Sequence, residues 1–349
     1  MPSVPLDLAP ITRHLRAKAS SHLLVAAIHH IPVFEALRKG PCSLLALQQQ
    51  LQLKQRPAMV LFPALCAMGL LQRNENGMLQ LTELGTYLTT DCPCNLIGYT
   101  GLEKDDPGVL RMAQELIHDG PEHKDQGLSY VKDEEAPSPM DEPEAATFFT
   151  LALAGRARYL SPVVAQVIPK QEGHLLDVAG GTGYYTYEFL LANPNATATI
   201  LDRPEVLKVA QSLLEEFCNR DRIGMSDLKK RVRFLPGDML QDELPNADIL
   251  FAFSLFHDWA EDTCRLLAQR FAAALQKGGT LWVHDAFLNN SMDGPLAVTD
   301  YSAQLFLNTK GRAYSAKEYS TWFSAAGLVP STTLTPTLLD YSLLFARKP

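Results

Sequence analysis

The sequence predicts an α/β fold, a doubly wound and mostly parallel sheet, preceded by a mostly helical domain. From residue 174 onward, short apolar runs alternate with stretches of helical spacing, the pattern of a parallel sheet with helices on both faces. Residues 175–190 read as a buried strand, a glycine turn and a helix. This order brings backbone N–H groups and a helix N-terminus to the carboxyl edge of the sheet, where α/β folds bind nucleotide-like ligands.

Residues 1–100 form the predicted helical domain. Three segments within residues 23–71 carry apolar side chains at three- and four-residue spacing, and a turn signal at 74–77 precedes the alternating segment 78–83. Three helices followed by a hairpin are typical of a winged-helix domain. The helix before the hairpin, residues 56–71, is apolar on nearly every face, which favours contact with another protein over contact with DNA. We therefore expect a winged-helix-like dimerisation domain.

Length and charge narrow the classes of function. With 349 residues the chain is long enough for two domains, and its formal net charge of −8 gives it no electrostatic reason to bind nucleic acid or an anionic membrane. The apolar stretch 23–34 contains His29, His30 and Pro32, so it does not read as a membrane span. The N-terminus lacks the pattern of a secretory signal and the six cysteines are scattered, so we expect a cytoplasmic protein with reduced thiols.

Residues 101–349 form the predicted second domain, and residues 101–165 are expected to be a helical linker and lid. The segment 120–144 is charged and rich in proline, which is typical of an exposed loop or lid. Helical spacing resumes at 145–168 and leads into the glycine motif. Further strands are expected at 196–202, 232–239, 247–256 and 279–288, helices at 205–217, 261–276 and 315–327, and two closing strands that end near residue 348.

Three glycines, Gly180, Gly181 and Gly183, form the predicted turn after the first strand. Glycine lets the backbone approach a ligand closely. A dinucleotide-binding motif would continue to a glycine or alanine at position 186, which is Thr186 in this chain. This departure counts against a tightly held pyrophosphate.

Two acidic residues end the next two strands. Asp202 is well placed to accept hydrogen bonds from ribose hydroxyls, and Asp238 can accept one from an adenine amine. The glycine turn and these carboxylates describe a nucleoside site without a strong phosphate clamp. S-adenosyl-L-methionine fits that description.

Six motifs occur in an order that is specific as a set. They are DVAGGTG, LDRPEV, PGDM, FHDWAEDTC, KGGTLWVHDAFL and KEYSTWFSAAGL. Over nearly the whole chain they resemble the small-molecule O-methyltransferases of the caffeate and hydroxyindole family. The resemblance implies a class I methyltransferase sheet, which is Rossmann-like, with an antiparallel last strand. It also implies a homodimer through the N-terminal domain, whose helices reach into the partner's active site.

The resemblance assigns S-adenosyl-L-methionine as the cofactor and implies the residues that hold it. The glycine turn lies under the amino-acid end of the cofactor, Asp202 holds the ribose, and Asp238 and Met239 flank the adenine. The expected cofactor contacts are Gly180, Gly181, Gly183, Asp202, Arg203, Asp238 and Met239.

The same resemblance implies methyl transfer to a hydroxyl of a small aromatic acceptor. His257 matches the family's general base, and Asp285 matches the acid, usually glutamate, that orients it. A carboxylate bonded to one ring nitrogen stabilises the imidazolium and leaves the other nitrogen free to take a proton. The expected acceptor contacts are Trp259, Gln304 and Asn308, the last two at polar pocket positions of hydroxyindole methylators.

Three positions depart from the family pattern. The family has a second glutamate that helps to hold the catalytic histidine, and Ala313 stands there, so the base has at most one acidic support. Ala179 replaces the first glycine of the family's triple, a small change that we expect to be tolerated. Phe253 stands where plant members often carry a lysine near the cofactor.

Other interpretations of the site remain open. The absence of the second acid favours a family member that uses bound S-adenosylmethionine for hydroxylation or pericyclic chemistry, and C- or N-methylation is a further alternative. A winged-helix regulator is opposed by the acidic charge. No metal is expected, since the spacing of the candidate ligands matches no known cluster; these are His257, Asp258, Glu261 and Asp262.

Two further pairs of residues have two interpretations each. Arg156 and Arg158 either pair with a carboxylate of the cofactor or substrate, or are surface charges. His29 and His30 either pack within the dimer or reach the partner's pocket.

Overall fold

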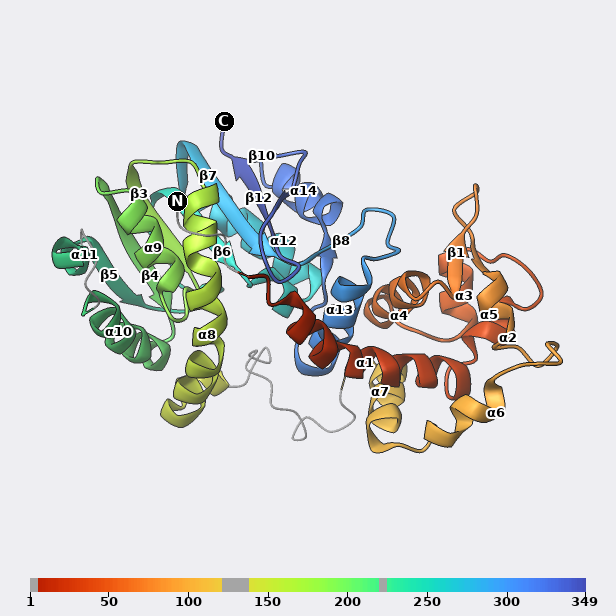
Figure 1. Cartoon of the computed structure of the whole chain (residues 1–349). Coiled ribbons are helices and arrows are strands. Elements are labelled where there is room, and N and C mark those ends of the chain that lie inside the picture. Colours follow the sequence, from red (N-terminus) through yellow and green to blue (C-terminus); the bar gives the residue numbers. More distant parts are fainter. Residues whose placement is uncertain (1–5, 121–137, 220–224) are drawn as a thin grey trace. The chain divides into compact units, whose positions relative to one another are not determined.

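The computed structural model describes residues 6–120, 138–219 and 225–349 (Figure 1). The chain forms two compact units that are each discontinuous in sequence. It leaves the second unit after Ala286 and re-enters it at Ala316. Unit 1 comprises Met1–Leu128 and Phe287–Ser315, and unit 2 comprises Ser129–Ala286 and Ala316–Pro349.

Unit 1 contains the predicted helices and hairpin. In the hairpin, β1 and β2 are antiparallel and pair Leu71 with Leu81. The first apolar segment forms two helices, α1 and α2, because Pro32 lies between them and cannot continue a helix. The N-terminal elements of the unit are α1 (Ala9–His29), α2 (Val33–Leu37), α3 (Leu44–Gln50), α4 (Gln55–Ala67), β1 (Leu71–Arg73), β2 (Leu79–Leu81), α5 (Glu83–Thr86), α6 (Ile97–Thr100), η1 (Gly101–Glu103) and α7 (Pro107–His118).

The division into units differs from the boundary expected at residue 100. Unit 1 continues through α7 and takes in a segment from far along the chain, β8 (Phe287–Leu288), α13 (Leu296–Asn308) and β9 (Tyr314–Ser315). α13 packs against α1 and α4 and contributes Ala303 and Phe306 to their hydrophobic core. Periodicity along the sequence cannot show which distant segment completes a core, and this is why the expected boundary is continuous.

Arg56, at the start of α4, forms hydrogen bonds with the backbone at the end of α13, within unit 1. Its guanidinium donates hydrogen bonds to the carbonyl oxygens of Gly311 at 3.0 Å, Phe306 at 2.9 Å and Thr309 at 2.6 Å. It also pairs with the carboxylate of Asp119 at 3.1 Å. The side chain is only 15% exposed, so these bonds form in a partly dehydrated environment.

Unit 2 is built on one sheet with the strand order β10-β12-β7-β6-β3-β4-β5, and β11 pairs with β12. The predicted mostly parallel sheet is confirmed, and β12 runs antiparallel to β7, as the family resemblance implies. β6 is almost entirely apolar and buried, which is typical of a strand covered on both faces. The strands are β3 (Gly173–Val178), β4 (Ala196–Asp202), β5 (Val232–Pro236), β6 (Ala247–Phe253), β7 (Leu275–Asp285), β10 (Val329–Pro330), β11 (Thr335–Pro336) and β12 (Ser342–Arg347).

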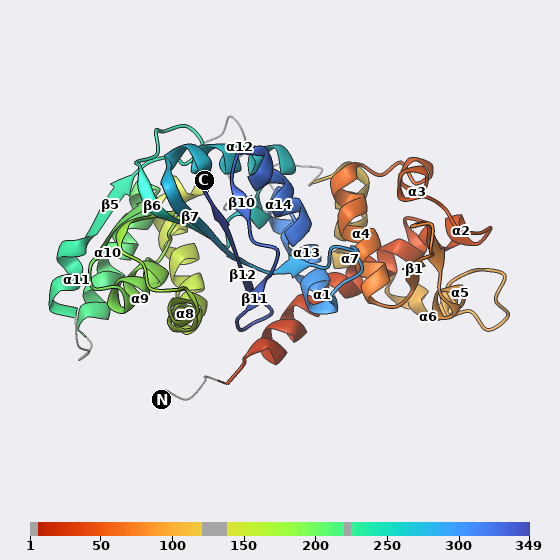
Figure 2. The same cartoon turned by 90° about the horizontal axis from the view of Figure 1, so that it is seen from above.

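Helices cover both faces of this sheet. α8, α9 and α10 lie on one face, and α12 and α14 lie on the other (Figure 2). Residues 121–137 of the expected lid lie outside the described residues. Of the rest of the expected linker, residues 101–120 include η1 and α7 of unit 1, and residues 138–165 form η2 and most of α8. The helices are η2 (Pro139–Asp141), α8 (Pro143–Val167), α9 (Tyr184–Ala192), α10 (Pro204–Cys218), α11 (Met225–Arg231), η3 (Phe256–Asp258), α12 (Glu261–Ala274) and α14 (Ala316–Ala325). Within the described ranges, no helix is long and apolar enough to cross a membrane.

The strand order reverses at β3, which has β4 on one side and β6 on the other. Open α/β sheets bind ligands at such a switch point, outside the carboxyl ends of the strands. The parallel pairing of Phe253 with His284 also brings the turn after β6 next to the end of β7. The polar residues predicted at the ends of different strands therefore meet at one edge of the sheet.

Candidate active site

A cavity lies at the carboxyl ends of β3, β4 and β6, and all of its lining residues belong to unit 2. Besides backbone and carboxylates, it is lined by the apolar side chains of Phe149 and Leu153 from α8. Residues of the predicted site are prominent in its lining; these are Gly180, Gly181, Asp202, Arg203, Asp238, Met239 and Trp259.

The glycine turn presents bare backbone at this cavity. A β-carbon added to Gly181 would meet only the carbonyl oxygen of Ala179, 4.0 Å away, so this position borders open space. At Gly180 an added β-carbon would lie 2.8 Å from a carboxylate oxygen of Asp177, so no side chain fits. Ala179, Gly181 and Gly183 have φ angles of 53°, 55° and 75°. Alanine is strained in this left-handed region by roughly 1 kcal/mol, so the departure at Ala179 has a modest cost in stability.

Asp202 ends β4 and holds the glycine turn in place. One carboxylate oxygen accepts a hydrogen bond from the backbone N–H of Gly181 at 2.8 Å, and the other accepts one from the N–H of Arg203 at 2.7 Å. Burial raises the pKa of Asp202 to about 6, against the opposite effect of these two hydrogen bonds. Each oxygen keeps a further lone pair, so the carboxylate can still accept from a ligand hydroxyl.

Arg203 lines the cavity, but its guanidinium is engaged by protein carboxylates. It donates two hydrogen bonds to Asp141 of η2, both at 2.6 Å, and pairs with Asp238 at 3.2 Å. The neighbours of Asp141 in the chain, Ser138 and Met140, also line the cavity. Arg203 therefore joins η2 to the ends of β4 and β5, a long-range arrangement that the sequence did not predict.

His257 and Asp285 form a buried pair beside this edge of the sheet. The Nδ1 atom of His257 lies 2.6 Å from a carboxylate oxygen of Asp285, and the two residues are 2% and 0% exposed. The Nε2 atom of His257 lies 3.5 Å from the carboxylate of Asp258. Among the described residues that line the cavity, Asp258 and Trp259 are the chain neighbours of His257, whereas neither His257 nor Asp285 belongs to the lining.

The carboxylates around His257 favour its protonated form. Burial by itself lowers the pKa of His257, but the charges of Asp285 and Asp258 and the hydrogen bond to Asp285 outweigh it and raise the pKa to about 9. The neighbouring His284 behaves in the opposite way, because burial lowers its pKa to about 3 and it stays neutral. Of His257 and His284, only His257 therefore has a pKa high enough for its ring to be protonated at neutral pH.

Two residues of the site were not singled out by the sequence. Asp177, inside the glycine motif, lines the cavity and accepts a hydrogen bond from the Thr186 hydroxyl at 2.6 Å; burial raises its pKa to about 7. An acid within an otherwise apolar strand was a signal for it. Tyr319 donates a hydrogen bond to Asp285 at 2.9 Å, and no motif pointed to this contact.

The predicted acceptor contacts and the two arginines of α8 lie in different environments. Gln304 and Asn308 belong to unit 1, where the Asn308 amide donates to the Gln304 carbonyl oxygen at 2.7 Å, so their contact with an acceptor stays a prediction. Arg156 lines the cavity and donates to the hydroxyl of Tyr341 at 3.0 Å, while Arg158 pairs with the exposed carboxylate of Glu216.

His29 and His30 bond within unit 1, to Thr100 at 3.0 Å and to the carbonyl oxygen of Lys104 at 2.8 Å. In the part of the chain that the structure describes, no group of three or more histidine, cysteine, aspartate or glutamate side chains could hold a metal ion.

The sequence model of the O-methyltransferase domain matches residues 143–329, just over half of the chain. The chain belongs to the O-methyltransferase family. Its cofactor is therefore S-adenosyl-L-methionine.

Relatives of known name or structure agree with this family. One similar crystal structure is that of an O-methyltransferase family 2 protein from Planctomyces limnophilus in complex with apigenin. Its sequence is 34% identical and the TM-score is 0.86. The match covers 99% of this chain and 97% of that protein. The 3-hydroxy-5-methyl-1-naphthoate 3-O-methyltransferase of Streptomyces sahachiroi is 28% identical over 87% of this chain and 84% of its own length. The acetylserotonin O-methyltransferase of Gallus gallus is 33% identical, but the match spans only 44% of this chain and 41% of the relative.

The residues of the cavity fit the cofactor of this O-methyltransferase family member. S-adenosylmethionine contains a ribose, an adenine and an amino acid, and the cavity combines bare backbone at Gly181 with the carboxylates of Asp202 and Asp238. The cavity lining also includes apolar side chains such as Leu201 and Met239. This donor and acceptor set suits a nucleoside and an amino acid and offers little that would hold a pyrophosphate.

Proposed function

We propose that this protein transfers a methyl group from S-adenosylmethionine to a hydroxyl of a small aromatic acceptor, with His257 as the general base. The observation that carries the proposal is the buried pair of His257 and Asp285, because the two residues that follow His257 in the chain, Asp258 and Trp259, line the cavity. The family of the chain supplies the class of reaction.

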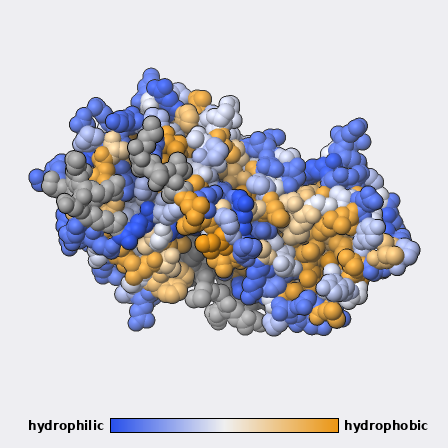
Figure 3. All heavy atoms as spheres, viewed as in Figure 1, coloured by the Kyte–Doolittle hydropathy of each residue, from blue (hydrophilic) through white to orange (hydrophobic). Residues whose placement is uncertain are grey.

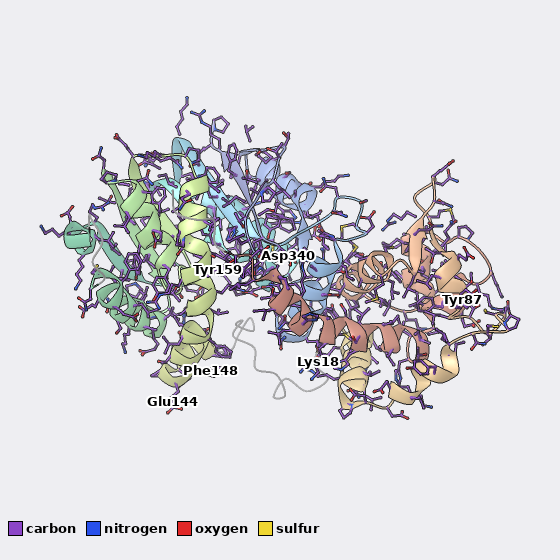
Figure 4. All side chains as sticks on the ribbon, viewed as in Figure 1. Lys18, Tyr87, Glu144, Phe148, Tyr159 and Asp340 are labelled. Atoms are coloured by element: carbon purple, nitrogen blue, oxygen red, sulfur yellow. The ribbon has the colours of Figure 1, made fainter. Side chains whose placement is uncertain are left out.

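Two features support an aromatic acceptor. The named relatives act on a naphthoate and on acetylserotonin, and the similar crystal structure holds apigenin. On this chain, Phe149 and Leu153 of α8 line the cavity, and so does Trp259. Hydrophobic side chains also gather over the N-terminal half of α8, where Phe148 and Leu151 are exposed (Figure 3, Figure 4). Apolar and aromatic walls favour a flat, weakly polar acceptor.

The arrangement of His257 explains how an acceptor hydroxyl would lose its proton. When bound, the cofactor supplies a methyl group on a positively charged sulfur. The Nδ1 atom of His257 donates to Asp285, which leaves Nε2 as the basic nitrogen. A phenol has a pKa of about 10, so the carboxylates of Asp285 and Asp258 help by stabilising the imidazolium that forms.

The pH dependence of turnover should follow the protonation of His257. Only the neutral imidazole accepts a proton, and the raised pKa of about 9 means that the free enzyme is mostly protonated at neutral pH. We expect kcat/KM for the acceptor to rise about tenfold per pH unit below this value and to level off above it. Steady-state rates with an acceptor whose own hydroxyl does not titrate in this range measure the profile, and a flat profile from pH 6 to 9 would contradict the assignment.

The cofactor and the reaction class can be tested together by calorimetric titration and an acceptor screen. We expect saturable binding of S-adenosylmethionine and none of NAD. Asp202→Ala should weaken the binding by about ten- to a hundredfold, since a hydrogen bond to a charged group contributes about 1.5–3 kcal/mol. Asp248→Ala is the matched control, because Asp248 lies at the opposite end of β6 and bonds the N–H of His174. Binding of NAD alone would overturn the proposal.

A second candidate function uses the same cofactor without methyl transfer. Ala313, in place of the family's second acid, motivates hydroxylation or pericyclic chemistry, and C- or N-methylation is the related alternative. Product analysis separates these reactions. Methyl transfer releases one S-adenosylhomocysteine per product, whereas hydroxylation or pericyclic chemistry releases none, and the methylated atom is identified by mass spectrometry and NMR.

We also propose a homodimer built through the N-terminal residues. Exposed apolar side chains on unit 1 support it, among them Ile11 and Leu15 of α1 and Tyr99 and Leu102 near α6. Light scattering of the purified protein decides the point, and a monomeric mass at micromolar concentration would refute it.

A further inference from the structure

Asp285 uses both of its carboxylate oxygens within the protein. One oxygen is shared by the Nδ1 atom of His257 at 2.6 Å and the backbone N–H of Ala286 at 2.8 Å. The other accepts a hydrogen bond from the hydroxyl of Tyr319, on α14, at 2.9 Å. All three donors are in place around one carboxylate that has no exposure to solvent.

The ring of Tyr319 is held so that its hydroxyl stays on Asp285. Tyr319 is itself fully buried, and its ring contacts those of Phe256, Trp322 and Phe323 at centroid distances of 5.2, 5.3 and 6.0 Å. Phe256 immediately precedes His257 in the chain. The aromatic cluster therefore fixes Tyr319 on one side and the turn that carries His257 on the other.

We infer that Tyr319 is a positioning residue for the general base, an inference that rests on the proposed function of His257. Its hydroxyl orients the Asp285 carboxylate, so that the other oxygen faces Nδ1 of His257 and fixes the orientation of the imidazole ring. The sequence has Ala313 where the family has a second acid, and Tyr319 supplies a second bond to the catalytic pair from within unit 2.

A hydroxyl donor and a second carboxylate differ in their electrostatic effect. The donor stabilises the negative charge of Asp285 directly, whereas a second acid near the pair would add negative charge. The positive end of the hydroxyl dipole also opposes protonation of the nearby imidazole. Tyr319 should therefore keep the proton affinity of His257 lower than the carboxylates alone would make it.

Several groups face His257, and each contributes to its titration. They are Asp285 on β7, Asp258 in η3, Tyr341 before β12 and, through Asp285, Tyr319 on α14. Tyr319 acts on Asp285 through a single hydroxyl that can be removed without changing the shape of the ring. That property makes its contribution separable from the others.

The test is Tyr319→Phe in the full chain, with Tyr187→Phe as the matched control. Tyr187 is equally buried in unit 2, but its hydroxyl donates to the backbone carbonyl oxygen of Ala210 at 2.9 Å. Both variants lose one buried hydroxyl, so both should be somewhat less stable. Only Tyr319→Phe should lower kcat, by roughly tenfold for the loss of one hydrogen bond to a charged group, and move the acid limb of kcat/KM to higher pH.

A second readout does not depend on turnover. NMR titration of histidine-labelled protein without ligands reports the protonation of His257 directly, and Tyr319→Phe should move its midpoint upward while Tyr187→Phe leaves it unchanged. Site-specific 3-fluorotyrosine at position 319 keeps the ring and strengthens the donor, so it should move the midpoint downward. This arm decides the question if Tyr319→Phe does not fold.

The outcomes separate the two proposals. A His257 midpoint that is the same in wild type and in both Tyr319 variants would overturn the positioning role and leave Tyr319 as packing. Full turnover of His257→Ala would instead overturn the proposed function, even with a shifted midpoint. A shifted midpoint together with a shifted limb of kcat/KM supports both.

Discussion

Replacing His257 with alanine should lower kcat by about 10²–10⁴-fold, the usual contribution of a positioned general base. The affinity for S-adenosylhomocysteine should stay unchanged, because His257 is not among the described residues that line the cavity. An effect on kcat with intact ligand binding is the signature of an interaction used only in the transition state. Single-turnover rates and calorimetry of the same preparation measure the two quantities.

The control for this variant is His174, another histidine of unit 2. His174 lies at the start of β3, at the opposite end from the cavity, and bonds the hydroxyls of Thr197 and Thr199, both at 2.9 Å. His174→Ala should leave kcat within about twofold of wild type. If His257→Ala keeps its turnover, or loses S-adenosylhomocysteine binding as well, then His257 is not the base or the site has collapsed, and the assignment fails.

Replacing Arg56 with methionine should reduce the free energy of unfolding by about 1.5–3 kcal/mol, the range for losing hydrogen bonds to a charged group at a partly buried position. Methionine keeps the bulk of the side chain, but Asp119 loses its cation and the carbonyl oxygens of Phe306, Thr309 and Gly311 lose this donor. Burial lowers the pKa of Arg56, although Asp119 opposes the shift, so the site already carries a desolvation penalty. Urea unfolding followed by far-UV circular dichroism gives the loss.

Arg38 offers a matched control for Arg56. Like Arg56, it forms ion pairs with carboxylates, in this case those of Glu35 and Asp91, but its side chain is 35% exposed. Exposed ion pairs contribute about 0–1 kcal/mol, so Arg38→Met should leave the unfolding midpoint nearly unchanged. Equal losses for the two variants would mean that the contacts of Arg56 with the end of α13 add nothing beyond surface charge.

The periodicity of the sequence predicted the central strands of unit 2 well, because β3, β4 and β6 are largely buried and read as nearly continuous apolar runs. β6, residues 247–253, is the clearest case. The limits of the units could not be predicted in the same way. α13 has helical spacing like any other helix, and only its packing against α1 and α4 assigns it to unit 1.

Some features of the candidate site could likewise be predicted from the sequence, and others could not. Asp202 ends β4 and Asp238 comes two residues after β5, so their presence at one sheet edge could be derived from the order of elements, and both line the cavity. The partners of Arg203 and Asp285 could not be derived. Asp141 and Tyr319 lie 62 and 34 residues away from them in the chain, and only the folded backbone brings these side chains together.

The chain passes between the two units three times, and these crossings govern how this protein can be recombined with its relatives. An exchange of residues 1–128 alone would join the α1 and α4 of one parent to the α13 of the other, and would mismatch the contacts of Ala303, Phe306 and Arg56. A fragment that begins at Ser129 would carry α13 without the helices that cover it. Modular exchange therefore requires both segments of unit 1 to come from one parent, with crossovers after Leu128, after Ala286 and after Ser315.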